Sequence, residues 1–129
     1  MTKKKFVFVN DAARRALKSL PKHIRQQFGA DLQAVQSGEK PFSSFKDVGD
    51  SVGTGAIELI ENGSPAYRAV YCVKFLDSVY ILHAFTKTAQ STDKKNMETA
   101  ARRYVLMKKA VEEAKKLAKD AAKKITKKR

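Results

Sequence analysis

Two neighbouring runs rich in β-branched and aromatic residues constrain the fold of this chain more than any other feature. They cover residues 66–75 and 79–85, and only Leu76, Asp77 and Ser78 separate them. Val, Ile, Tyr and Phe suit the pleated surface of a sheet, and a hairpin is the shortest connection between two such runs. The sequence therefore predicts two antiparallel strands that are neighbours in one sheet.

Basic side chains accompany this predicted hairpin. Side chains alternate along a strand, so Arg68 and Lys74 lie on the same face of the first run. In the second run, His83 is expected on the face of three apolar residues, Val79, Ile81 and Phe85. Lys87 follows just beyond that run. Burial of these charged side chains would be unfavourable in a hairpin covered on both faces. We therefore expect a sheet with one solvent-exposed, basic face.

The N-terminal part of the chain combines a strand with two helices. Residues 6–9 are expected to form a short strand, and Asn10 or Asp11 can cap the helix that follows. Helical spacing of apolar residues predicts two consecutive helices, separated at Pro21. Their apolar stripes are Ala13, Ala16, Leu17 and Leu20 in the first and Ile24, Phe28, Leu32 and Val35 in the second.

The second half adds strands and a last helix. Residues 38–55, rich in Gly and Ser, are expected to be mostly loop, and the alternating Ala56–Glu61 segment a strand. After the hairpin, a helix is expected from about Asp93. This order is typical of an α+β fold, with an N-terminal strand and a helical hairpin packed on a largely antiparallel sheet and a C-terminal helix.

The charge of the chain is strongly positive. Lys and Arg number 27 against 13 Asp and Glu, a formal net charge of +14, and such a surface attracts polyanions. Residues 108–129 hold ten basic and three acidic side chains, a net of +7, which leaves +7 for residues 1–107. We expect a folded domain over residues 1–107 and a Lys/Ala-rich extension over 108–129 that projects as a helix or frays. Its lysines should add affinity for a polyanion rather than chemistry.

Cysteine usage and hydropathy favour a cytoplasmic protein. The single Cys72 cannot form an internal disulfide and is expected to be a small buried thiol. No apolar run approaches the roughly 18 residues of a membrane span, and we expect no signal peptide. No Cys/His cluster has the spacing of a metal site, so neither a metal nor another cofactor is expected.

Residues from Glu58 onward form an ordered series of polar, aromatic and apolar positions. They are Glu58, Leu59, Tyr67, Arg68, Tyr71, Leu82, His83, Ala84, Phe85, Lys87, Thr92, Ala100 or Ala101, and Arg103. With them, residues 6–107 resemble the RelE/HigB superfamily of bacterial and phage toxins, most closely its phage-derived Gp49-like branch. The resemblance implies a toxin of a type II toxin–antitoxin pair, an endoribonuclease that cleaves mRNA without a metal, usually on the ribosome. The implied partners are a helix-turn-helix antitoxin, mRNA and the ribosome, and no membrane.

Metal-free RNA cleavage needs a base for the 2′-hydroxyl, cations for the pentavalent phosphate and an acid for the 5′-oxygen. As catalytic residues we expect Arg68 to clamp the phosphate, Lys87 to stabilise the developing charge and His83 to carry a proton. Glu58 is a further candidate base or a solvated strand carboxylate. Contacts with the RNA backbone are expected from Lys74, Lys94, Lys95, Arg102 and Arg103.

Three positions depart from the family pattern. Ile60 stands where Arg is usual, Thr88 where a second Lys is usual and Asp93 where Pro is usual. The missing charges predict reduced or altered activity. The main alternative is a non-catalytic nucleic-acid-binding module of the same fold, and a third is an interaction protein with a solubilising tail. At the residue level, the alternatives are an ion-paired Arg68 and a hydrogen-bonded His83 under the last helix.

Overall fold

Five strands and three helices follow one another within residues 3–75, 77–88 and 90–127, the part of the chain that the computed structural model describes. They are β1 (Lys5–Phe8), α1 (Asp11–Lys18), α2 (Lys22–Gln36), β2 (Ser44–Asp47), β3 (Ala56–Glu61), β4 (Ala66–Cys72), β5 (Ser78–Lys87) and α3 (Gln90–Lys127). The predicted α+β class is confirmed. None of the helices in the described segments is long and apolar enough to cross a membrane.

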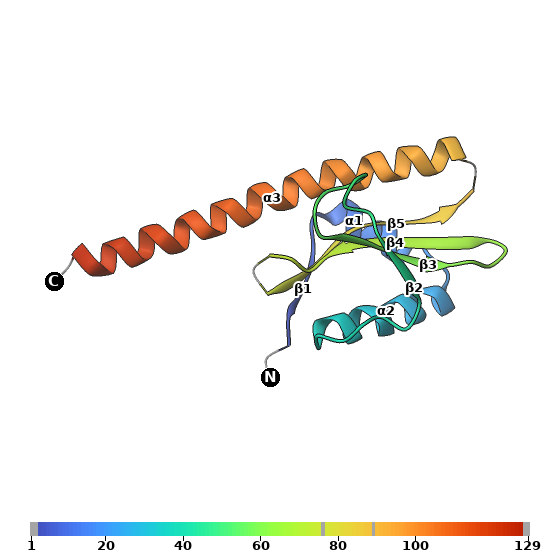
Figure 1. Ribbon diagram of the computed structural model, residues 1–129, viewed down its shortest axis with the longest axis horizontal. Coiled ribbons are helices and arrows are strands. Elements are labelled where there is room, and N and C mark those ends of the chain that lie inside the picture. Colours follow the sequence, from blue (N-terminus) through green and yellow to red (C-terminus); the bar gives the residue numbers. More distant parts are fainter. Residues whose placement is uncertain (1–2, 76, 89, 128–129) are drawn as a thin grey trace.

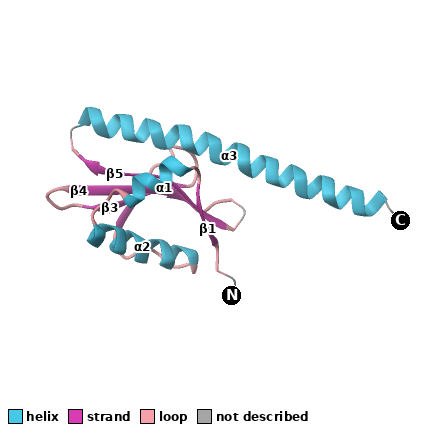
Figure 2. Cartoon of the chain, turned by 180° about the vertical axis from the view of Figure 1, so that it is seen from behind, coloured by secondary structure: helices cyan, strands magenta, loops and turns pink. Residues whose placement is uncertain are grey.

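The strands form one mixed sheet in the order β1-β5-β4-β3-β2. β1 runs parallel to β5, whereas β2, β3, β4 and β5 pair antiparallel in sequence order. The predicted hairpin is therefore present as β4 and β5. α2 lies against one face of the sheet and α3 runs across the other (Figures 1 and 2).

Two apolar cores result, one on each face of the sheet. Phe28 and Leu32 of α2 pack with Leu59, and this core also includes Tyr71. Burial and the charge of Asp31 raise the pKa of Tyr71 to about 12, so its hydroxyl stays protonated. On the α3 side the members include Val48, Val52, Val70, Cys72, Leu82, Tyr104 and Met107. Cys72 is a buried free thiol, as predicted.

β2 was not predicted, because it lies inside the segment expected to be mostly loop. All four of its residues, SFKD, are exposed, so no apolar alternation marks it in the sequence. It forms by pairing with β3, with Phe45 opposite Leu59 and Lys46 opposite Glu58. A short edge strand of this kind depends on its neighbour's ladder rather than on its own side chains.

The solvent-exposed basic face predicted for the hairpin is wrong for Arg68 and His83. α3 covers that face, and the two residues expose only 7% and 8% of their surface. The predicted orientation of His83 is also wrong with respect to Val79 and Ile81, which lie in the core on the α2 face, and is confirmed with respect to Phe85. Val70 pairs with His83 but Tyr71 pairs with Ile81, so Leu82 is an extra residue in β5. This bulge turns both Leu82 and His83 toward α3, because it interrupts the alternation of side chains.

A buried carboxylate fixes the connection from α2 to β2. Asp31 of α2 is fully buried, and its Oδ1 accepts hydrogen bonds from the backbone N–H groups of Phe42 and Ser43 at 2.8 and 2.9 Å. Its Oδ2 accepts a third from the Ser43 hydroxyl at 2.6 Å. These bonds pair three donors of the irregular segment before β2 with one buried acceptor group.

The loop between β2 and β3 packs under α3 and forms one wall of the site described below. The Tyr104 hydroxyl donates a hydrogen bond to the carbonyl oxygen of Thr54 at 2.7 Å. Gly53 has a φ of +154°, and a Cβ at this residue would lie 2.3 Å from the Tyr104 ring. Glycine is required here because the aromatic ring occupies the place of a side chain.

α3 begins near the predicted start and continues without interruption to Lys127. Ala100, Tyr104, Met107 and Val111 are buried against the sheet at helical spacing. Packing thus continues to Val111, four residues beyond the predicted end of the domain. The side chains of residues 112–123 are all exposed, and this part of α3 extends away from the sheet (Figures 1 and 2).

Candidate functional site

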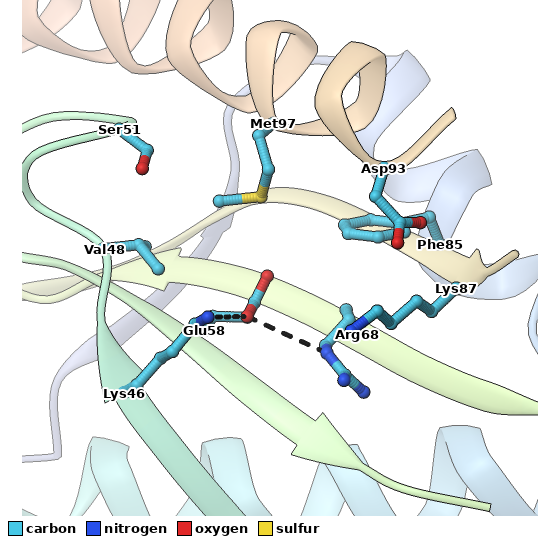
Figure 3. Close-up of a pocket in the computed structure, with 9 residues that line it drawn as sticks. All are labelled: Lys46, Val48, Ser51, Glu58, Arg68, Phe85, Lys87, Asp93 and Met97. Carbon is cyan, nitrogen blue, oxygen red and sulfur yellow. Dashed lines mark ion pairs between the residues drawn. The ribbon is translucent and has the colours of Figure 1, made fainter. Parts of the chain in front are cut away.

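A cleft of about 280 Å³ opens between the first turns of α3 and the sheet (Figure 3). Its polar lining residues are Lys46, Ser51, Glu58, Arg68, Lys87 and Asp93. Val48, Phe85 and Met97 supply the apolar part of the wall. Four successive strands, the β2–β3 loop and α3 therefore meet at this one place.

Strand register determines which charged side chains meet. Lys46 of β2 lies directly opposite Glu58 of β3, and both therefore point to the α3 side of the sheet. Arg68 of β4 pairs with Phe85 of β5, and Val70, two residues further along β4, pairs with Glu58. Arg68 is thus the diagonal neighbour of Glu58 on the same face.

Glu58 is a buried carboxylate between two cations. It exposes 4% of its surface, and its Oε1 lies 3.6 Å from the Nζ of Lys46 and 3.8 Å from the Nε of Arg68. Of the two cations, Lys46 is largely exposed and Arg68 is buried. Because Arg68 and Glu58 are both buried, solvent screens their interaction less than it screens the interaction of Glu58 with Lys46.

Three further hydrogen bonds fix the guanidinium of Arg68. It donates to the carbonyl oxygen of Tyr67 at 2.9 Å, to Oδ1 of Asn62 at 3.0 Å and to the carbonyl oxygen of Glu61 at 3.4 Å. The β3–β4 turn therefore holds this side chain in place from one side, and Glu58 from the other. A guanidinium oriented in this way needs little rearrangement to receive an anion in the cleft.

Lys87 and Asp93 lie at the open side of the cleft. The exposed Lys87 follows β5 and extends toward Arg68, and Asp93 points down from α3 beside Phe85 (Figure 3). Oδ1 of Asp93 accepts a hydrogen bond from the backbone N–H of Thr88 at 3.4 Å. Two of the positions that depart from the family pattern thus contact each other at the start of α3. Within the described segments, no three His, Cys, Asp or Glu side chains gather as a metal site.

His83 lies beside the cleft but does not line it. Its Nδ1 accepts a hydrogen bond from Arg103 at 2.9 Å, because a guanidinium can only donate, and its Nε2–H therefore donates to Oδ1 of Asn96 at 2.8 Å. Its ring stacks on Phe85, with 5.5 Å between the centroids. Both nitrogens of the neutral imidazole are engaged, and this geometry does not favour the proton-carrying role predicted for His83.

Acid should weaken the fold through His83. Burial lowers its pKa from the ordinary 6.5, the Asn96 hydrogen bond opposes this, and the charge of Arg103 lowers it further. Below pH 6.5 the imidazole of His83 therefore binds a proton in the unfolded chain but not in the folded protein. We expect the free energy of unfolding to fall by up to about 1.4 kcal/mol per pH unit from pH 6.5 down to the folded pKa.

Urea unfolding between pH 7.5 and 5 measures this loss of stability. The variant His83→Gln should lack the part of the pH dependence that comes from His83, because glutamine does not titrate. The matched control is His23→Gln, at the exposed histidine of α2. If the unfolding free energy of His83→Gln still falls with pH while that of His23→Gln does not, the pH dependence does not come from His83.

The residues predicted to contact RNA lie in different places. Lys94 and Lys95 are exposed on the first turns of α3, and Arg102 is exposed further along, where it bonds Thr99. Lys74 is exposed after β4, at the opposite end of that strand from Arg68. Arg103 instead points inward and donates to the carbonyl oxygen of Leu82 at 3.1 Å, so it ties α3 to the bulge in β5.

The sequence did not single out Lys46, and it left Glu58 undecided. Lys46 lies in the segment expected to be mostly loop, where a lone lysine carries no signal. Glu58 carried a weak signal, because a carboxylate inside the otherwise apolar AIELIE strand needs a partner when it is buried. The pairing of β3 with β2 shows that Lys46 is its partner, and the pairing of β3 with β4 shows the same of Arg68.

Comparison with known proteins gives one family. A family model described as phage derived protein Gp49-like matches residues 15–105, which is more than half of the chain. The match confirms the resemblance found in the sequence, and it includes every residue that lines the cleft. Neither the curated proteins nor the solved structures contain a match.

Proposed function

The chain belongs to the Gp49-like phage-derived family, a RelE/HigB-like toxin family, and from this premise we propose that it is an endoribonuclease that cleaves mRNA without a metal. Its site is the cleft lined by Glu58, Arg68 and Lys87. It acts in the cytoplasm on mRNA, in association with the ribosome, and a helix-turn-helix antitoxin inhibits it. The buried guanidinium of Arg68, held in the cleft wall beside Glu58, is the observation that carries this proposal.

The cleft residues supply each group that the reaction needs. Glu58 takes the proton of the 2′-hydroxyl, whose oxygen then forms a bond to the adjacent phosphorus. Arg68 and Lys87 stabilise the extra negative charge of the pentavalent phosphate. The bond from phosphorus to the 5′-oxygen breaks, and this oxygen takes a proton from the ammonium group of Lys87. The products are a 2′,3′-cyclic phosphate and a 5′-hydroxyl.

The remaining predicted residues act around this centre. Lys46 adds positive charge next to Glu58, and His83 is a positioning residue that supports Phe85 and Arg103. Lys94, Lys95 and Arg102, all exposed on α3, hold the RNA backbone on the outside of the cleft. Arg103 is engaged with β5, and we propose no direct RNA contact for it.

A specific observation favours a second candidate, a module that binds nucleic acid without cutting it. Glu58 already occupies Arg68 as an ion-pair partner, and a substrate phosphate must compete with this carboxylate. In addition, His83 is not available as an acid or a base, and Ile60, Thr88 and Asp93 replace charges or a proline usual in the family. Binding by the exposed lysines does not need the cleft to be open.

Incubation of the purified protein with mRNA decides between the two candidates, with free mRNA in the presence of EDTA and with mRNA on ribosomes in a buffer that contains Mg²⁺. We expect fragments with 2′,3′-cyclic phosphate and 5′-hydroxyl ends, since a 2′-hydroxyl attack leaves both and needs no metal. Expression of the chain alone should also arrest bacterial growth. RNA binding without fragments under either condition would reject the endoribonuclease and favour the binding module.

A further inference from the structure

The C-terminal part of α3 has one basic side and one apolar side. We call residues 112–127 the arm. With 3.6 residues per turn, the lysines from Lys108 onward whose side chains the structure describes occupy about one third of the helix circumference. They are Lys108, Lys109, Lys115, Lys116, Lys119 and Lys123, which we call the lysine face. Glu112 lies within this face, and Glu113 and Asp120 border it.

The opposite side of the arm offers little to a protein partner. Among the residues of this side whose side chains the structure describes, Ala114, Ala118 and Ala121 are small, and Leu117 is large and apolar and exposes 69% of its surface. A coiled-coil seam needs large apolar residues at every third or fourth position, and alanine does not supply them. Charge is therefore the main binding feature of the arm, and its sign selects a polyanion.

The lysine face begins on the body of the protein. The Nζ atoms of Lys108 and Lys115 lie 4.9 and 5.9 Å from the ring centroid of Phe75, which follows β4. The exposed Lys74 precedes Phe75 in the same connection between β4 and β5. The basic surface thus runs from the end of the sheet onto the arm.

The same helix links this surface to the cleft. Met97 of α3 lines the cleft, and at 1.5 Å per residue Lys115 lies about 27 Å and Lys123 about 39 Å further along the helix axis. At about 3.4 Å per stacked nucleotide, the first distance corresponds to roughly eight nucleotides. Because α3 is continuous, this separation is built into the fold.

We propose that the lysine face is a second RNA-binding site, which holds backbone phosphates roughly eight or more nucleotides from the phosphate in the cleft. The proposal rests on the proposed function, because it assumes that RNA occupies the cleft. The arm lies beyond residues 15–105, so this site is an addition to the part of the chain that the family shares. It recognises phosphates and not bases, since ammonium groups act as point charges.

The test measures binding of RNAs of 4, 8, 12 and 20 nucleotides, 2′-O-methylated so that they cannot be cut. The variant carries Lys115→Gln, Lys116→Gln, Lys119→Gln and Lys123→Gln, which keep helix propensity and remove four charges. The matched control carries Ala114→Gln, Ala118→Gln and Ala121→Gln on the opposite side. Both should melt like the wild type, because every substituted side chain is exposed.

We expect the lysine variant to lose at least about tenfold in affinity for the 20-nucleotide RNA at 0.1 M salt, and its salt slope to fall by about 2.8. The 4-nucleotide RNA should bind both variants alike, since it is too short to reach from the cleft to the arm. Equal affinities of the lysine variant and the control for the long RNA, or an equal loss at every length, would overturn the proposal.

Failure of the second site and failure of the proposed function give different results. If the lysine variant loses affinity for long RNA while the wild type cleaves no mRNA, the second RNA-binding site is supported and the endoribonuclease activity is rejected. If the wild type cleaves mRNA while the lysine variant binds long RNA normally, the endoribonuclease activity is supported and the second RNA-binding site on the lysine face is rejected.

Discussion

We expect replacement of Arg68 by alanine to lower the rate of the proposed RNA cleavage by about 10²- to 10³-fold, the usual cost of removing one donor that stabilises a transition-state charge. Among the described residues that line the cleft, Arg68 is the one buried cation, and its hydrogen bonds to Tyr67 and Asn62 hold the guanidinium in place. Arg68→Lys keeps the charge but loses the planar fork, so it should retain only part of the activity. Cleavage of a labelled RNA at saturating substrate measures both variants.

Stability has to be followed in the same experiment, because Arg68→Ala leaves the buried Glu58 with Lys46 as its remaining ion-pair partner. We expect a lower melting temperature but a folded protein at the assay temperature. The matched control is Arg25→Ala, which removes an exposed arginine from α2 outside the cleft and should cleave like the wild type. Wild-type cleavage by Arg68→Ala would show that the active site lies elsewhere. If Arg68→Ala unfolds and Arg68→Lys is fully active, Arg68 is structural.

Replacement of Asp31 by alanine should cause a large loss of stability, about 3 kcal/mol in the free energy of unfolding. The substitution leaves two backbone N–H groups and the Ser43 hydroxyl without their acceptor, and each buried donor without a partner costs about 1–3 kcal/mol. The total is expected to be smaller than three such costs, because water can reach part of the segment before β2 once it is no longer bound to Asp31. Urea denaturation of the variant and the wild type at pH 7 measures the difference.

Two further variants separate the contributions at this position. Ser43→Ala removes only the hydroxyl and should cost about 1 kcal/mol, and Asp31→Asn keeps an acceptor for the backbone and should fall between the two. Because Asp31 holds the segment before β2, the loss should be accompanied by weaker protection of β2 in hydrogen exchange. An Asp31→Ala protein as stable as the wild type would mean that this segment does not depend on the carboxylate.

The sequence predicted the elements that have a strong local pattern. The stripes at helical spacing gave both N-terminal helices, and the density of β-branched and aromatic residues gave β3, β4 and β5. These predictions succeed because each pattern reflects which side of one element is buried. The same local information failed for β2, whose four exposed residues show no alternation.

The candidate site was predicted only in part, because side chains meet there from elements far apart in the chain. Arg68 and Lys87 both line the cleft, as expected of neighbouring strands in one hairpin. Glu58 joined them through the register of β3 on β4, and Lys46 through the register of β2 on β3. One extra residue, Leu82, redirected His83 toward Arg103, and a bulge of this kind leaves no mark in the pattern of residues.

The amino-acid sequence by itself determined the α+β class, the central hairpin, the family and the basic charge of the arm, since local periodicity, residue order and composition carry each of them. Only the tertiary structure decided which face of the sheet α3 covers and that Glu58 lies between Lys46 and Arg68. It also decided that the arm continues α3 as one helix that leads away from the cleft. These features depend on strand register and on packing between distant segments, which are settled by the free energy of the whole fold.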